Sequence, residues 1–248
     1  VGNEWIVTSD EVSKVLANAE DRTIYLAEGN DYGTVTAGEL KNVTIVGGED
    51  SVLNFVTDAN SKLENVTLKS VDFVYDGSNV NSGIVINAEA QIDNLVVEGC
   101  SFVGTGEKKG RGIYGQNSTA TITLKNCSFK DLGYPIYTMA GGGYASLVVE
   151  GCTFEGIRSW AIMPQYNSYE GDLTVTGNTF TNCVGGLVKA GAFTAGHTFT
   201  FTNNVVTGCT VSGDHNWFSI NTAAATKVVS GNVKDGAEWN PTDANGLK

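Results

Sequence analysis

The sequence lacks a membrane span and an interdomain linker. No apolar run approaches the roughly 18 residues needed to cross a bilayer, and no proline- or serine-rich stretch divides the 248 residues. Leucine is sparse, whereas valine, threonine, glycine and asparagine are plentiful, which favours strands and tight bends. No leader segment precedes Val1, so we expect a mature or trimmed product. These absences predict a single all-β domain, residues 1–248.

Positive charge is also scarce. The sequence contains 15 Lys and Arg residues and 27 Asp and Glu residues, which gives a net charge of −12. A nucleic-acid partner would require a basic stripe to displace counterions, and adhesion to anionic membranes would require basic residues as well. The composition therefore predicts no nucleic-acid partner.

Five cysteines are too few, and odd in number, for a disulfide scaffold. Cys100, Cys127 and Cys152 occupy one slot of an internal repeat, which Asn178 and Asn204 take in the next two copies. Cys183 and Cys209 share a second slot. We interpret these as stacked, buried packing ladders, because free cysteine behaves as a small hydrophobic residue. CxxC-type spacing is missing, so no metal site is predicted, and a disulfide between neighbouring coils stays open.

The repeat itself is a nine-residue phrase that returns every 25 to 29 residues. Its copies are residues 94–102, 121–129, 146–154, 172–180 and 198–206, with a weaker copy at 65–73. Each copy alternates apolar and polar residues, as in Leu95 and Val97, which predicts a strand with one buried face. Gly or Asn follows, where the chain can bend, and then Phe or Val turns inward again. Repetition at this period indicates a solenoid.

A second strand is predicted about ten residues later in each copy. Its inward positions are Ile84, Ile113, Ile136, Ile162, Leu187 and Phe218. No helical periodicity lies between the strands, and the leucine-rich repeat pattern is absent. We therefore predict an all-β, single-stranded, right-handed parallel β-helix of about nine coils, the first near Thr23 and the last near Thr226.

The open ends of a solenoid need covers. Thr8–Glu11 resembles a capping box, and Val12, Val15, Leu16 and Ala19 follow at helical spacing. We expect residues 1–22 to form an N-terminal cap that contains this amphipathic capping helix, residues 23–230 the coils, and residues 231–248 a C-terminal cap or tail.

The series Glu-Gly-Cys-Ser-Phe, Lys-Asn-Cys-Ser-Phe and Glu-Gly-Cys-Thr-Phe resembles the pectin-lyase-like superfamily of right-handed parallel β-helices. It is most similar to secreted and surface-associated members from gut Bacteroidetes. The resemblance spans roughly residues 20–235 and rests on scaffold positions. It implies a secreted or cell-surface bacterial protein, and an external groove for acidic polysaccharides.

The catalytic motifs of that superfamily are mostly missing. The polygalacturonase motifs are incomplete. Phe180 follows Asn178-Thr179 where the motif requires aspartate, no Asp-Asp pair occurs, and no Arg-x-Lys follows His197. For a lyase, the weak catalytic candidates are Arg158, Lys189 and His215, which occur in no recognised motif. Calcium is conceivable for a lyase, yet no motif indicates it, so no cofactor is predicted. Enzymatic activity stays uncertain, with a polysaccharide lyase favoured over a glycoside hydrolase.

A binding surface has more support. Aromatic and cationic residues gather beside the second strand, where rings offer platforms to sugars and cations attract carboxylates or sulfates. The predicted ligand-binding residues are Arg111, Tyr114, Tyr137, Trp160, Tyr166 and Trp217. The competing interpretation is that these aromatics only cover the β-surface.

Three hypotheses follow for the function. The first is a secreted or cell-surface protein that binds a polysaccharide or other glycan, acidic ones foremost, as an accessory to polysaccharide use. The second is a polysaccharide lyase with an unrecognised site. The third is a structural module of an adhesin or tail fibre.

Overall fold

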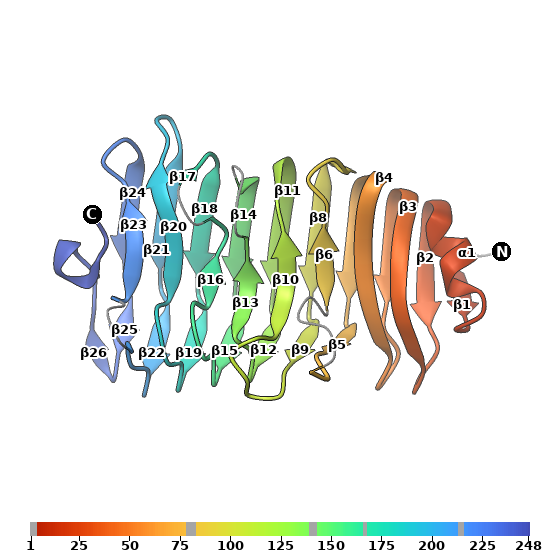
Figure 1. The fold of residues 1–248 in the computed structure, drawn as a ribbon, viewed down its shortest axis with the longest axis horizontal. Coiled ribbons are helices and arrows are strands. Elements are labelled where there is room, and N and C mark those ends of the chain that lie inside the picture. Colours follow the sequence, from red (N-terminus) through yellow and green to blue (C-terminus); the bar gives the residue numbers. More distant parts are fainter. Residues whose placement is uncertain (1–3, 78–82, 139–142, 166–167, 213–215) are drawn as a thin grey trace.

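The chain forms a β-solenoid whose turns stack along one long axis (Figure 1). The computed structural model describes residues 4–77, 83–138, 143–165, 168–212 and 216–248. All 26 strands of the described part join one sheet, in which every pairing but one is parallel. No helix in these described ranges is long and apolar enough to cross a membrane.

Each turn has three sides, and the repeated phrase begins on the first, side A. Its inward residues, such as Leu95, Ile122 and Leu147, are in register on successive turns and at most 1 % exposed. The strands with a part on side A are β1 (Glu4–Val7), β2 (Asn18–Leu26), β3 (Asp31–Val46), β4 (Val52–Lys69), β8 (Asn94–Glu98), β11 (Asn117–Lys125), β14 (Tyr144–Glu150), β18 (Asp172–Thr176), β21 (Thr198–Thr202) and β24 (Thr226–Ser230).

Side B holds the phenylalanine that ends each phrase. The rings of Phe73, Phe102, Phe129, Phe154 and Phe180 stack with centroids 4.6–4.9 Å apart, which equals the spacing between paired strands. The strands of side B are β5 (Asp72–Val74), β9 (Ser101–Val103), β12 (Ser128–Lys130), β15 (Thr153–Glu155), β19 (Thr179–Thr181), β22 (Val205–Thr207) and β25 (Val233–Lys234).

Side C is the predicted second strand. Its strands are β6 (Ile84–Ile86), β10 (Arg111–Gly115), β13 (Tyr134–Tyr137), β16 (Ile162–Met163), β20 (Val188–Phe193) and β23 (Phe218–Asn221). Ile84, Ile113, Ile136 and Ile162 form one buried column, as predicted. The next member in register is Val188 rather than the predicted Leu187, and both side chains are buried.

The corner between sides A and B follows a packing rule. Asn126 and Gly151 occupy the bend on successive turns, and both have positive φ (52° and 63°). A Cβ atom on Gly151 would lie only 2.5 Å from Oδ1 of Asn126. The Asn126 side chain therefore covers the glycine of the next turn, and Asn203 covers Gly231 in the same way.

The predicted interior ladders are confirmed. All five cysteines are free and buried. A hydrogen bond with Cys127, together with burial, raises the pKa of the Cys100 and Cys152 thiols far above its usual range. Asn178 and Asn204 continue this column, and the structure adds a third buried member, Asn232.

Two details of the prediction differ from the structure. The solenoid has about seven turns rather than nine. Seven turns have a separate side-B strand, from β5 to β25, whereas β2 and β3 are long continuous strands ahead of them. The capping helix α1 (Val12–Ala17) is short. Val12 and Leu16 are buried as predicted, but Ala19 belongs to β2, and β1 lies ahead of the helix.

The C-terminal end is covered by residues that follow the last side-B strand. Strand β26 (Ala237–Glu238) pairs with β25 in antiparallel orientation. After the short helix η1 (Asp243–Asn245), the fully buried Leu247 bridges to Ile220. Trp239 packs against Phe201 and Phe218, and so closes the core. The remaining short strands are β7 (Gln91–Ile92) and β17 (Ser168–Tyr169).

Candidate functional site

Aromatic side chains cover the outer face of side C in the middle turns. Because Ile113, Ile136 and Ile162 point inward, their neighbours Tyr114, Tyr137 and Met163 point outward, and these three are in register on successive turns. Arg111, at the start of β10, is in register with Tyr134 at the start of β13, and both side chains contact the outward tyrosines. We call this surface the aromatic patch, and it consists of Arg111, Tyr114, Tyr134, Tyr137, Trp160 and Met163.

The centre of the aromatic patch is a cation held against two rings. The guanidinium carbon of Arg111 lies 4.5 Å from the ring centroid of Tyr114 and 4.4 Å from that of Tyr137. The two rings are nearly parallel, at 17°, with centroids 5.9 Å apart, and Tyr134 leans on Tyr137 at 4.6 Å. This packing fixes the plane of the guanidinium, whose fork of N–H donors matches carboxylate and sulfate geometry.

The members of the patch differ in exposure. Trp160 and Tyr137 are only 4 % and 9 % exposed, whereas Arg111, Tyr114 and Tyr134 are half-buried. Trp160 lies flat on the next turn, since a Cβ atom on Gly186 would be 1.9 Å from its ring. Lys189 Nζ covers the indole at 5.6 Å from the ring centroid. Trp160, Tyr137 and the equally buried Met163 therefore support the surface, and Arg111, Tyr114 and Tyr134 form its accessible part.

A hollow of about 340 Å³ lies beside Tyr114. Its lining comes from four successive turns, so it runs along the solenoid axis. Asn87, Gln116 and Thr138 give it amide and hydroxyl groups, and Thr57 Oγ1 fixes one wall by accepting a hydrogen bond from the Asn87 backbone N–H at 2.8 Å. An elongated ligand with hydroxyl groups fits such a lining.

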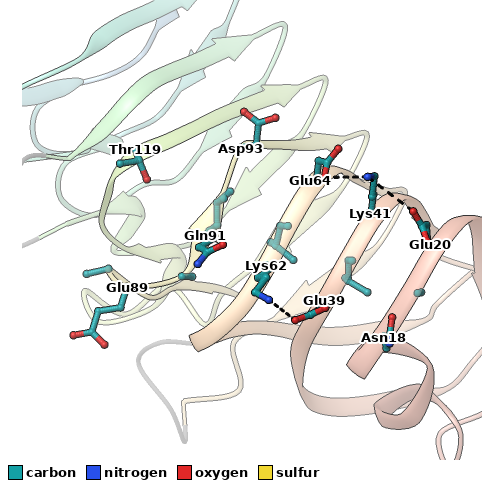
Figure 2. A pocket seen from close by; sticks show the side chains of 16 residues that line it. Asn18, Glu20, Glu39, Lys41, Lys62, Glu64, Glu89, Gln91, Asp93 and Thr119 are labelled. Atoms are coloured by element: carbon teal, nitrogen blue, oxygen red, sulfur yellow. Dashed lines mark hydrogen bonds and ion pairs between the residues drawn. The ribbon is translucent and has the colours of Figure 1, made fainter.

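A second hollow, of about 750 Å³, lies nearer the N-terminus and shares Ala88 with the first. Figure 2 shows Lys41 between Glu20 and Glu64, with ion-pair distances of 3.9 and 3.6 Å, and Lys62 paired with Glu39. Five carboxylates and only two lysines line this hollow. Its negative charge disfavours an anionic ligand, so the two hollows differ in the ligand charge they suit. The carboxylates are Glu20, Glu39, Glu64, Glu89 and Asp93.

Four other predicted residues are not members of the aromatic patch. Arg158 is exposed in the segment between β15 and β16. Trp217 precedes β23, four turns after Tyr114, and packs against Trp239 (5.7 Å) and Lys234 (5.2 Å). Tyr166 and His215 lie outside the described residues. Across the described ranges, no three His, Cys, Asp or Glu residues form a metal-binding group.

Sequence reasoning left several members of the site out of the predicted set. Tyr134 could have been found by aligning Arg111-Gly-Ile-Tyr114 with Tyr134-Pro-Ile-Tyr137, since that alignment is the observed register. Met163 follows Ile162 as Tyr137 follows Ile136, so the same alignment includes it. Gly186 carries no such signal, because its role depends on a contact between turns. Asn87 and Gln116 are polar residues of a kind that occurs throughout the sequence.

Comparison with known proteins agrees with this architecture. The family model described as a right-handed beta helix region matches residues 50–232, which include the whole aromatic patch and both of the hollow walls built from β6 and β10. A search of the curated proteins finds no match.

Proposed function

The chain belongs to the family of right-handed β-helix regions, and we propose that on this scaffold it binds a glycan at the aromatic patch. The observation that carries the proposal is the position of Arg111 over the rings of Tyr114 and Tyr137, at the edge of a hollow that crosses four turns. A sugar ring can pack on an aromatic face while its charged substituent meets the guanidinium.

The charge distribution supports an acidic glycan at this patch. Lys108 and Lys109 are exposed just before Arg111, and Lys189 lies over Trp160 on the same side. These cations stand out on a protein with a net charge of −12. A local positive field of this kind attracts an anionic ligand that the rest of the surface repels.

The direction of the hollow supports a polymer over a single sugar. Thr57, Asn87, Gln116 and Thr138 lie on successive turns, and turns are spaced by roughly 4.8 Å. A chain of sugar units laid along the axis would meet one polar side chain per turn. We therefore propose a polysaccharide that binds lengthwise.

The proposal extends to the protein's setting. The phrase series resembles secreted and surface members of the pectin-lyase-like superfamily from gut Bacteroidetes, and glycan binding is consistent with a bacterial secreted or cell-surface protein that assists polysaccharide use. Neither a nucleic acid nor a cofactor enters this proposal.

The test is retention on an immobilised panel of uronic-acid polymers and neutral dextran, with Tyr114→Ala and Tyr134→Ala as variants and Arg158→Ala as the matched control. We expect retention on acidic members, lost in the two tyrosine variants and kept in the control. Release of unsaturated products that absorb in the ultraviolet would instead show a polysaccharide lyase. If the chain is not retained on any polymer and no product is released, the result would contradict glycan binding. It would then favour a structural adhesin or tail-fibre module.

A further inference from the structure

Two thiols lie on successive turns at the corner between sides B and C. Cys183 follows β19 and Cys209 follows β22, two paired strands near the C-terminal end of the solenoid (Figure 1). The next residues, Val184 and Thr210, form a parallel bridge, and the Thr210 N–H donates to the Cys183 carbonyl at 2.9 Å. Cys183 and Cys209 are therefore in register.

The backbone holds this pair at a spacing that a disulfide can span. Residues in register on paired strands have Cα atoms about 4.8 Å apart, and disulfides join Cα atoms roughly 4.4 to 6.8 Å apart. The Cys209 sulfur also lies on the side that faces its partner, because it accepts a hydrogen bond from the Cys183 backbone N–H at 3.3 Å. A disulfide between the two thiols needs no change in the register of the turns.

The two thiols differ in chemistry. A hydrogen bond from the Cys183 thiol lowers the pKa of Cys209 to about 7, and the backbone bond from Cys183 acts in the same direction. The same contact, together with burial, raises the pKa of Cys183 above its usual range. Because the thiolate is the nucleophile in thiol–disulfide exchange, Cys209 is the residue of the pair that attacks first.

Cys209 is also the most accessible of the five thiols. It is 6 % exposed, whereas the other four are at most 2 % exposed. After β25 the chain bends at Asp235 and Gly236, both with positive φ, and returns as the antiparallel strand β26. The chain therefore does not continue as a further regular turn over Cys209. In contrast, Asn178 of the next turn covers Cys152 and accepts a hydrogen bond from its N–H.

We propose that Cys183 and Cys209 form a reversible disulfide when the protein meets a small-molecule disulfide. With oxidised glutathione, the Cys209 thiolate attacks one sulfur, which gives a mixed disulfide and expels one glutathione thiolate. The Cys183 thiol passes its proton to that thiolate and attacks the Cys209 sulfur, which expels the second glutathione. Two protein thiols are thus oxidised to one disulfide, while one glutathione disulfide is reduced to two thiols.

The disulfide would join residues 26 apart in sequence, around one complete turn. A turn of a solenoid contacts only its neighbours, so unfolding can begin at an end. A covalent link between two turns near the C-terminal end restricts the unfolded chain and opposes this opening. Arg111, Tyr114 and Tyr137 lie on earlier turns, so the disulfide forms whether or not the aromatic patch binds a glycan.

Mapping the disulfide tests the proposal on the unmodified chain. The reduced protein is incubated with oxidised glutathione near neutral pH, remaining thiols are alkylated, and the digested peptides are identified by mass spectrometry. We expect a peptide pair linked through Cys183 and Cys209, with Cys100, Cys127 and Cys152 alkylated. No linked pair, or links among the other three cysteines formed equally fast, would overturn the proposal.

Serine variants test the order of attack. Cys183→Ser should stop at the mixed disulfide, with glutathione retained on Cys209. Cys209→Ser should react with glutathione disulfide at least tenfold more slowly, and Cys127→Ser, the matched control, should form the disulfide at the original rate. Circular dichroism of each variant checks that it folds. Equal rates in Cys209→Ser and the original chain would overturn the assignment of Cys209 as the attacking thiol.

Thermal unfolding measures the effect of the link. The oxidised chain should have a thermal midpoint higher by about 5 °C than the reduced chain. Treatment with a dithiol should reverse the increase, and Cys209→Ser should show none after the same oxidation. A linked chain that unfolds at the same temperature as the reduced chain would contradict the stabilising role of the disulfide.

Discussion

The side-chain oxygen of Asn204 accepts two hydrogen bonds from Asn178, one turn earlier, from the backbone N–H at 2.9 Å and from Nδ2 at 3.1 Å. The side-chain oxygen of Asn232 likewise accepts hydrogen bonds from the backbone N–H and Nδ2 of Asn204. The side-chain oxygen of Asn178 accepts one from the backbone N–H of Cys152. All three asparagines are fully buried. The ladder satisfies backbone groups that the bend removes from the strand pairing, which explains why a polar residue occupies an interior slot.

Replacement of Asn204 by leucine should destabilise the protein by about 3 to 5 kcal/mol, because the buried N–H of Asn178 loses its acceptor and the carbonyl of Val175 loses the hydrogen bond from Asn204 Nδ2. Urea unfolding monitored by circular dichroism measures the loss. Thr200→Val, on the half-buried outer face of the preceding strand β21, is the control and should change stability by less than about 0.5 kcal/mol. Equal losses in the free energy of unfolding for the two variants would show that the asparagine ladder does not stabilise the protein more than an outer-face side chain does.

Gly186→Ala should destabilise the aromatic patch, because the new methyl group would collide with the Trp160 ring. We expect a loss of about 1 to 3 kcal/mol, typical of overpacking. In a Trp160→Ala background the same substitution should cost much less, since the ring is gone. A double-mutant cycle from urea unfolding tests this coupling. Additive changes in the free energy of unfolding would mean that the Trp160 ring does not require glycine at position 186.

Stability should fall at alkaline pH because of two interior tyrosines. Burial raises the pKa of Tyr144 and Tyr169 above the ordinary value of 10.0. Their hydroxyl groups donate to the carbonyls of Gly115 (2.8 Å) and Asp172 (3.3 Å). Above pH 10 the unfolded chain loses these protons and the folded chain keeps them, so the stabilisation is complete below pH 10 and declines as pH rises.

Urea unfolding between pH 8 and 11.5 measures this decline. In the double variant Tyr144→Phe, Tyr169→Phe the slope should become shallower by about 2.7 kcal/mol per pH unit, the value for two protons. The lost hydrogen bonds lower stability equally at every pH and do not affect the slope. The same slope in the double variant and the original chain would exclude these tyrosines as its cause.

The sequence predicted the scaffold because each slot of the phrase has a separate physical role that repeats. Leu95 and Val97 alternate with a period of two, and the bend residues follow at a constant distance, so the register of sides A and B could be read directly. The buried position of Asn232 was not predicted, because Lys234 occupies the slot that holds phenylalanine or Val206 in the earlier copies.

The candidate site was predictable only in part. The outward position of Tyr114 and Tyr137 follows from alternation with the inward isoleucines. The burial of Trp160 does not, because it depends on the missing side chain of Gly186 a full turn later. The position of Arg111 over both tyrosine rings is likewise a contact between turns, which residue order alone does not encode.

The most direct test of glycan binding is the affinity of the chain for polygalacturonate, measured by calorimetric titration at low and physiological salt. If the Arg111–Tyr114 contact forms the site, Tyr114→Ala should weaken binding at least tenfold, or about 1.4 kcal/mol. Arg158→Ala should leave the affinity unchanged, and added salt should weaken binding because the ligand is anionic. Unchanged affinity in Tyr114→Ala, or equal losses in both variants, would contradict the proposed site.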